Sequence, residues 1–258
     1  MSSFKTFKEE ILKEYPRLGP DDTYEFKCHP GVPCFNKCCS DINIFLTPYD
    51  VIRLKKGLGI TSDEFLSKYT QMVADETQQY PVLQLKMNDT KDKECPFVTD
   101  NGCGVYEDRP WPCRMYPLGS ASPKDEEEEK LFYFLMKEEI CKGFEEKQEW
   151  KISDWLKDQD IAKFDEIGEY FKEITLHDFF YKGKTLEPKK MQMFFMVCYN
   201  IDSFRKFVFE STFLDRFDVD DKTVNAIKED DVELFKFGVS WLKFSLFGEN
   251  TLTLKKTH

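Results

Sequence analysis

The sequence contains little histidine and no excess of basic residues. Its 258 residues include three histidines, and 48 Asp and Glu outnumber 37 Lys and Arg, which gives a formal net charge of −11. Nucleic-acid binding needs a concentrated patch of Lys and Arg, and none is visible, so we expect no nucleic-acid partner. The same acidic balance argues against binding to an anionic membrane surface.

Segments that would carry the chain into or across a membrane are also missing. The longest apolar run, Met193 to Tyr199, is far shorter than the roughly 20 residues that a spanning helix needs. The first ten residues lack the apolar core of a secretory signal. We therefore expect a cytoplasmic protein, and because thiols stay reduced in that compartment, metal binding is favoured over disulfides.

Familiar catalytic motifs are absent as well. The chain has no phosphate-binding Gly-rich loop, no dinucleotide-binding fingerprint, no nucleophile elbow and no His-Glu-x-x-His helix. A cysteine–histidine pair would have to use His29 or His177, and neither has a supporting context. The sequence therefore leaves open whether the protein is an enzyme, and it indicates no substrate.

What the chain does have is cysteine, concentrated in its N-terminal half. Short spacings separated by proline and glycine allow several thiolates to face one centre. We predict eight metal ligands: Cys28, Cys34, Cys38, Cys39, Cys95, Cys103, Cys113 and Cys141. The remaining cysteine, Cys198, lies in a helical apolar run and is predicted to be a core residue.

Eight thiolates suit two centres of four ligands, since a tetrahedral zinc ion and a cubane iron–sulfur cluster each take four. Cys38 and Cys39 are neighbours whose side chains should diverge, so the pair can serve two different centres or one larger one. The spacing lacks the regular two-residue repeat of zinc ribbons and bacterial ferredoxins. We favour iron–sulfur clusters of the [4Fe–4S] type, with zinc as the alternative.

Cys95 and Cys103 lie on either side of a predicted hairpin turn, Asp100-Asn101-Gly102. In a regular hairpin, at about 3.3 Å per residue, the two cysteines could be more than roughly 10 Å apart. Either the arm that carries Cys95 bends, or the two cysteines serve different centres.

Other side chains beside the cysteines can tune a metal centre. Arg109 and Arg114 flank Cys113 and can offset thiolate charge or donate hydrogen bonds to sulfur, and the alternative is an ordinary salt bridge with Glu107 or Asp108. His29, next to Cys28, is expected to lie outside the ligand set. His177 and His258 are expected at the surface.

The cysteine motifs resemble those of a known family. The four-cysteine group with its adjacent pair is followed by three further motifs, Cys95-Pro96-Phe97, Gly102-Cys103-x-Val105-Tyr106 and Arg109-Pro110-x-x-Cys113-Arg114-x-Tyr116-Pro117. With them, residues 24 to 145 resemble the YkgJ-type cysteine-cluster family, described as zinc- or iron-chelating. The first group departs from the commoner form of the family, in which two residues separate the cysteines.

The hydrophobic pattern predicts an α+β protein, in which a cysteine-rich N-terminal half with short strands and loops around a metal site packs on a mainly helical C-terminal half. We expect residues 1–145 and 146–258 to form these two regions, packed as one unit. Thr47 and Pro48 should start a helix that ends near Gly57 and Gly59, Thr61 and Glu64 should cap the next, and Ser153 should cap the first helix of the second region. A helix through Phe4–Leu12 and a solvated acidic loop at 125–129 are also predicted.

Two classes of function follow. The first is an iron–sulfur protein with a redox or cluster-dependent role, which needs a redox partner or substrate. The second is a zinc protein without catalysis, either a structural or interaction module whose fold depends on the metal or a metal-handling protein.

Overall fold

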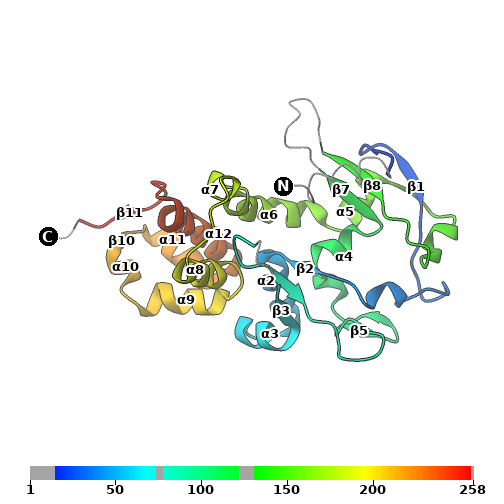
Figure 1. The fold of residues 1–258 in the computed structure, drawn as a ribbon, viewed down its shortest axis with the longest axis horizontal. Coiled ribbons are helices and arrows are strands. Elements are labelled where there is room, and N and C mark those ends of the chain that lie inside the picture. The colour runs from blue at the N-terminus through cyan, green and yellow to red at the C-terminus, as the bar shows by residue number, and fades with distance from the viewer. Residues whose placement is uncertain (1–14, 74–77, 122–130, 257–258) are drawn as a thin grey trace.

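The computed structural model describes residues 15–73, 78–121 and 131–256. The helix predicted at Phe4–Leu12 and the acidic loop predicted at 125–129 lie outside these ranges. Figure 1 shows the helices of the C-terminal half gathered at one end of the molecule and the strands β1, β7 and β8 at the other. The predicted α+β arrangement, with the cysteines in the N-terminal half, is confirmed.

The strands are short and pair antiparallel in five small sheets, ordered β1-β9, β2-β4-β3, β5-β6, β7-β8 and β10-β11. The strands are β1 (Thr23–Glu25), β2 (Phe45–Leu46), β3 (Thr70–Met72), β4 (Leu83–Leu85), β5 (Val98–Thr99), β6 (Gly102–Cys103), β7 (Leu118–Ala121), β8 (Phe132–Leu135), β9 (Glu149–Lys151), β10 (Phe217–Asp218) and β11 (Thr253–Leu254). No large sheet therefore organises the described part of the chain, and the core is built mainly from helices.

Most of the helices follow residue 150. The α-helices are α2 (Pro48–Leu58), α3 (Ser62–Tyr69), α4 (Trp111–Met115), α5 (Ile152–Asp158), α6 (Ile161–Thr175), α7 (Asp178–Tyr181), α8 (Pro188–Cys198), α9 (Ile201–Glu210), α10 (Phe213–Arg216), α11 (Asp221–Glu229) and α12 (Asp231–Leu242). Shorter turns are the 3-10 helices η1 (Lys37–Cys39), η2 (Tyr106–Asp108) and η3 (Lys142–Glu145), and the π-helical turn η4 (Lys243–Phe247). Within the described ranges, no helix has the length and apolar character needed to cross a membrane.

Local capping signals fix the ends of α2 and α3 as predicted. Thr47 and Asp50 form a capping box at the start of α2, Pro48 is its first residue, and Gly59 ends it with φ 65°. Thr61 and Glu64 form the capping box of α3. The prediction for Ser153 is wrong by two positions: α5 starts at Ile152, Lys151 takes the N-cap position without a side-chain cap, and the Ser153 N–H donates to Pro20 O instead.

Two hydrophobic clusters make up the core. The larger one joins α2, β2 and β4 to helices α6, α8, α9 and α12, with fully buried residues such as Leu54 and Phe204. The smaller one lies around β1 and the start of β7, where Phe26 packs against Trp155 of α5. Cys95, Cys103 and Cys113 pack against the larger cluster and Cys141 against the smaller one. The cysteines therefore lie where the two clusters meet. The division at residue 145 stays a prediction.

Lys55 ties α2 to two later helices. Its ammonium lies 2.8 Å from a carboxylate oxygen of Asp202 in α9 and 2.9 Å from one of Asp231 in α12. Burial opposes ionisation of Asp202, but hydrogen bonds from Lys55 and from the Ser62 N–H, together with the Lys55 charge, keep its pKa below the ordinary value. This ion pair network joins the first half of the chain to the second.

Replacing Lys55 by methionine keeps an apolar stem in place but removes the shared cation. Because both carboxylates are partly exposed, we expect the free energy of unfolding at pH 7 to fall by about 1–3 kcal/mol, less than for a fully buried pair. Since the folded state lowers the pKa of Asp202, this stabilisation is present above the ordinary value of 3.8 and is lost as the pH falls through the lower folded value. The difference between wild type and variant should therefore shrink in acid.

Urea unfolding at several pH values measures this difference. Lys56→Met, at the exposed neighbouring position, is the control and should change stability by no more than about 0.5 kcal/mol. Equal losses for the two variants would show that the Lys55 charge does not join the helices.

Candidate metal centre

Consecutive tight turns shape the loop that carries the first four cysteines. Backbone hydrogen bonds of 2.9–3.1 Å close turns from Val32 to His29, Phe35 to Val32, Lys37 to Cys34 and Cys39 to Asn36. Asn36, in the left-handed region at φ 67°, precedes η1. The chain thus winds back on itself between Cys28 and Cys39, as the density of proline and glycine predicts.

One set of thiols, which we call the first set, faces the smaller hydrophobic cluster. Its members are Cys28, Cys34, Cys38 and Cys141, which line one cavity of about 40 Å³ together with Phe26 and Tyr116. Burial and the neighbouring thiols of Cys38, Cys34 and Cys141 raise the pKa of Cys28 to about 11. The Lys142 N–H, next to Cys141, donates to Cys34 Sγ at 3.0 Å. The structure therefore brings Cys141 to the first loop across more than 100 residues.

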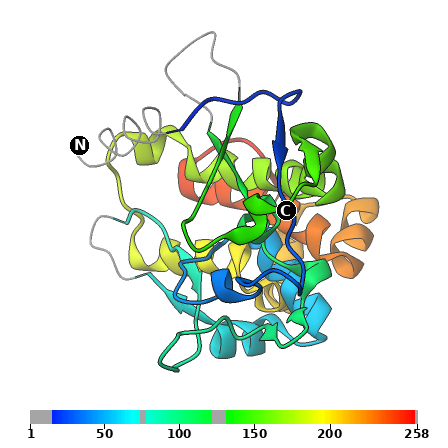
Figure 2. The same ribbon diagram turned by 90° about the vertical axis from the view of Figure 1, so that its right-hand side faces the viewer.

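A second set lies on the side of the larger cluster. Its members are Cys39, Cys95, Cys103 and Cys113. The Cys95 N–H donates to Cys39 O at 2.7 Å, which joins the first loop to the second cysteine segment. Burial and then the Cys95 and Cys103 thiols raise the pKa of Cys113 to about 12. Figure 2, coloured by position in the chain, shows the blue segment with η1 between the green segments around β7 and β8 and the hairpin β5-β6.

A bend before β5 decides whether Cys95 and Cys103 lie close together. Val98 pairs with Cys103 across the hairpin, and its N–H donates to Cys95 O at 3.1 Å, so the chain turns immediately before β5. This turn brings Cys95 close enough to Cys103 that the Cys103 thiolate charge raises the pKa of Cys95. Of the two alternatives, the arm bends, and the two cysteines belong to one set.

Backbone N–H groups are directed at several sulfur atoms. Those of Phe97 and Val98 lie near the Cys95 sulfur, and that of Val105 lies near the Cys103 sulfur. Burial raises the pKa of both thiols, and these N–H groups oppose the rise because they stabilise the thiolate. A backbone that folds back over a cysteine in this way stabilises the thiolate, which is the form of cysteine that binds a metal.

Cys38 and Cys39 contribute to different sets but are hydrogen-bonded to each other. The Cys39 thiol donates to Cys38, which lowers the pKa of Cys38 to about 7 although burial opposes the shift. The same bond and burial raise the pKa of Cys39. Whether the pair serves two different centres or one larger one stays a prediction. Among the described residues, no three His, Cys, Asp or Glu side chains are close enough together to hold a metal ion, so the sets are neighbourhoods and not closed coordination spheres.

Asp50 is a fully buried carboxylate beside Cys113. It accepts hydrogen bonds from the Thr47 N–H, the Thr47 hydroxyl and the Trp111 N–H, each at 2.8 Å. Burial raises its pKa, and these hydrogen bonds counteract the rise. Because its oxygens are taken by the first turns of α2 and α4, Asp50 positions the helix that carries Cys113.

Arg109 and Arg114 are both buried and bind the loop around Cys113. Arg109 donates to Tyr106 O and to the Gln159 side chain, and its guanidinium lies 3.6 Å from the centre of the Tyr106 ring. Arg114 donates to Arg109 O and Gln159 O at 3.0 Å. The predicted alternatives were a bond to sulfur or a salt bridge to Glu107 or Asp108. In the structure both guanidinium groups instead donate to backbone carbonyl oxygens, and Asp108 pairs with Arg53 at 2.8 Å. The Arg109 charge still lowers the pKa of Cys103 and Cys113.

Tyr116 carries a buried hydroxyl at the first set. The hydroxyl makes no hydrogen bond of normal geometry to any described residue. Burial raises its pKa, and the adjacent Cys141 thiol raises it further. A buried donor without a partner is costly, so a thiolate or a cluster sulfur at this position would complete its hydrogen bonding.

The remaining cysteine and the histidines lie outside both sets. Cys198 is 3% exposed within the larger cluster, which confirms its prediction as a core residue. His29 accepts from the Gly31 N–H and lies 3.4 Å from the Glu146 carboxylate, and its place outside the ligand set stays a prediction. His177 lies at the surface with 26% of its side chain exposed, pairs with Glu249 at 3.1 Å and stacks on Phe247 with the ring centroids 3.7 Å apart. His258 lies outside the described residues.

Sequence reasoning missed the roles of Asp50 and Tyr116. The capping box of Asp50 with Thr47 is a local signal in the sequence. The contact of Asp50 with Trp111 has no such signal. Tyr116 stands in the Cys113-x-x-Tyr116-Pro117 motif, yet its approach to Cys141 depends on the pairing of β7 with β8.

Residues 27–154 match the family model CxxCxxCC, whose description is "putative zinc- or iron-chelating domain". No curated protein and no solved structure gives a significant match to the chain. The matched range contains all eight cysteines of the two sets and leaves Cys198 outside. Residues 27–154 are therefore similar to the CxxCxxCC family, a family of cysteine-cluster domains described as zinc- or iron-chelating.

Proposed function

We propose that this domain holds two separate metal centres, one in each set of four cysteines, and that each centre is a [4Fe–4S] cluster. The observation that carries the proposal is the division of eight thiols into two neighbourhoods, with Cys38 facing one and Cys39 the other. Four thiolates complete the ligation of one cubane cluster, so no further ligand is required from either neighbourhood.

The surroundings of the two sets fit thiolate-ligated centres. Backbone N–H groups already point at Cys34, Cys95 and Cys103, and such bonds stabilise and tune bound sulfur. The Tyr116 hydroxyl would find its partner at Cys141. Asp50 is not available as a ligand, because its oxygens accept three hydrogen bonds. Both centres would therefore be ligated by sulfur alone.

The adjacency of Cys38 and Cys39 supports a redox role. Their Cα atoms are separated by one peptide unit, about 3.8 Å, so two clusters ligated by this pair would be near neighbours. Cys28 and Cys38 in the first set are exposed, whereas all four cysteines of the second set are partly buried. Electrons would thus enter from a partner at the first centre and pass inward to the second.

Zinc is the second candidate, and one observation favours it. The cavity at the first set is small, about 40 Å³. A single ion needs less room than a cubane cluster, so the thiols would have to move less to hold it. In that case the centres would stabilise the fold or hold zinc for transfer.

Metal content tests the proposal directly. Protein purified without oxygen should contain about eight iron and eight acid-labile sulfide ions per chain, because each cluster has four of each. Elemental analysis and the visible absorption spectrum measure this. About two zinc ions per chain without sulfide would support the zinc proposal in place of the cluster proposal. Protein purified in this way that contains no metal would contradict both proposals.

Single substitutions of the adjacent cysteines test the division into two sets. Cys38→Ala and Cys39→Ala should each lose about half of the metal, because each removes a ligand from one centre of four. Metal analysis with spectroscopy of the remaining centre should show a different surviving centre in each variant. Cys198→Ala, in the core, is the control and should keep all of it. Complete loss in both variants would instead indicate one larger centre built by all eight thiols.

Tyr116→Phe tests the buried hydroxyl at the first set. If the hydroxyl donates to a sulfur of the loaded centre, its removal should lower the reduction potential by roughly 20–60 mV, the equivalent of about 0.5–1.5 kcal/mol for one electron. Tyr24→Phe is a matched control, because the Tyr24 hydroxyl is also buried without a partner among the described residues but is not a neighbour of any cysteine in the sets. Equal potentials for wild type and Tyr116→Phe would exclude this hydrogen bond.

A further inference from the structure

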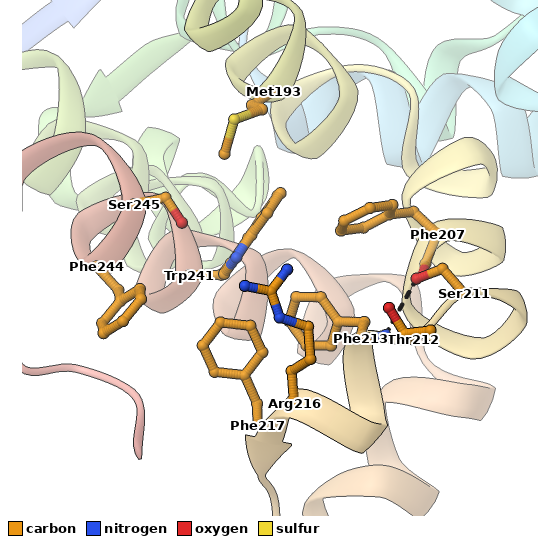
Figure 3. Close-up of a pocket in the computed structure, with 10 residues that line it drawn as sticks. All are labelled: Met193, Phe207, Ser211, Thr212, Phe213, Arg216, Phe217, Trp241, Phe244 and Ser245. Carbon is orange, nitrogen blue, oxygen red and sulfur yellow. Dashed lines mark hydrogen bonds between the residues drawn. The ribbon is translucent and has the colours of Figure 1, made fainter. Parts of the chain in front are cut away.

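A second cavity lies in the helical half, at the opposite end of the molecule from the cysteines (Figure 1). Its volume is about 350 Å³, and its walls come from α8, α9, α10, β10, α12 and η4. Figure 3 shows the side chains that line it. This size is at the lower end of the range for small-molecule sites, roughly 300–1,000 Å³.

Aromatic rings form most of the wall. They are Phe207, Phe213, Phe217, Trp241 and Phe244. The rings touch one another in a continuous series, with centroid separations of 4.7 Å for Phe213–Phe217, 5.6 Å for Phe213–Trp241 and 5.5 Å for Phe217–Phe244. A flat apolar group would find edge and face contacts here without reorganising the wall.

Arg216 provides the one cation that lines this cavity within the described part of the chain. It ends α10, and Figure 3 shows its guanidinium lying toward Trp241 over the aromatic residues. Its backbone is fixed, since Arg216 O accepts a hydrogen bond of 2.8 Å from the Lys255 N–H. Its side chain makes no hydrogen bond or ion pair to any residue that the structure describes, and neither Asp215 nor Asp218 pairs with it.

Other arginines of the helical core and the metal-binding half have partners for their guanidinium groups, in contrast to Arg216. Arg53 pairs with Asp108, Arg205 with Asp231, and Arg109 and Arg114 donate to carbonyl oxygens. In a chain with a net charge of −11, carboxylates are plentiful, yet none pairs with Arg216 among the described residues. An unpaired guanidinium beside apolar rings has its fork of donors available for an outside anion.

We propose that this cavity binds a small monocarboxylate with a flat apolar body, with the carboxylate on Arg216 and the body against Trp241 and Phe213. A guanidinium and a carboxylate match in two parallel charge-assisted hydrogen bonds. One arginine in an otherwise apolar and hydroxyl-lined wall suits a single negative charge, whereas a nucleotide or polyphosphate would need more cations. An organic cation is disfavoured by the Arg216 charge. The proposal does not depend on the metal centres.

Direct binding measurements test the proposal on the full chain purified without oxygen. The probes are 3-phenylpropionate and 3-phenylpropan-1-ol, which share the same body and differ in charge. Calorimetry should give a dissociation constant of about 1 mM or tighter for the acid and at least tenfold weaker binding for the alcohol, because the charge-assisted bonds are lost. Equal affinities, or no binding of the acid, would overturn the proposal.

Variants locate the site. Arg216 is exposed, so Arg216→Gln should fold normally, weaken binding of the acid by about tenfold or more and leave the alcohol unchanged. Lys222→Gln removes one exposed positive charge from α11, outside the cavity, and should bind both probes like wild type. Ser245→Phe places a ring in the cavity and should abolish binding of both probes. Unchanged binding of the acid by Arg216→Gln, or an equal loss in Lys222→Gln, would refute the assignment to Arg216. Metal content measured on the same samples separates this result from the proposal for the cysteine sets.

Discussion

A single buried carboxylate joins the helical core to the loop that carries the metal ligands. Asp50 caps α2 through Thr47 and at the same time accepts a hydrogen bond from the first residue of α4, Trp111. Burying a carboxylate is unfavourable unless its oxygens are hydrogen-bonded, so neither helix start can move without leaving a charge unsatisfied. Cys113, two residues into α4, is therefore placed against the larger hydrophobic cluster. Arg53 strengthens the same junction from α2 through Asp108.

The position of η1 between two hydrophobic clusters explains why one loop serves two sets of thiols. Cys141 packs on the smaller cluster, whereas Cys95, Cys103 and Cys113 pack on the larger one. Cys38 neighbours thiols of the first set and Cys39 neighbours thiols of the second. Metal at either set would tie a loop to one cluster, and metal at both would hold the two clusters together. Under the proposed function, metal binding at the cysteines would in this way be coupled to the packing of the two clusters.

The aromatic cavity around Arg216 belongs to the opposite end of the fold and uses none of these contacts. Its wall is built by α10, α12 and η4, which lie outside the residues that match the metal-chelating family. A chain with a metal domain at one end and a small-molecule site at the other would combine two binding functions on one helical core. The cores of the two are continuous, because Trp241 and Cys113 both pack in the larger cluster.

The sequence by itself determined the features that depend on a few neighbouring residues. The start of α2 at Thr47 and Pro48, the capping box of Thr61 with Glu64, the turns between Cys28 and Cys39, the short strands and the presence of eight clustered cysteines could all be predicted, because each is a local pattern of side chain and backbone. Only the tertiary structure decided which thiols are neighbours. The bond from the Cys95 N–H to Cys39 O, the bond from the Lys142 N–H to Cys34 Sγ and the approach of Tyr116 to Cys141 join residues that are 56, 108 and 25 positions apart. Such contacts are selected by the packing of whole elements, and no spacing in the sequence encodes them.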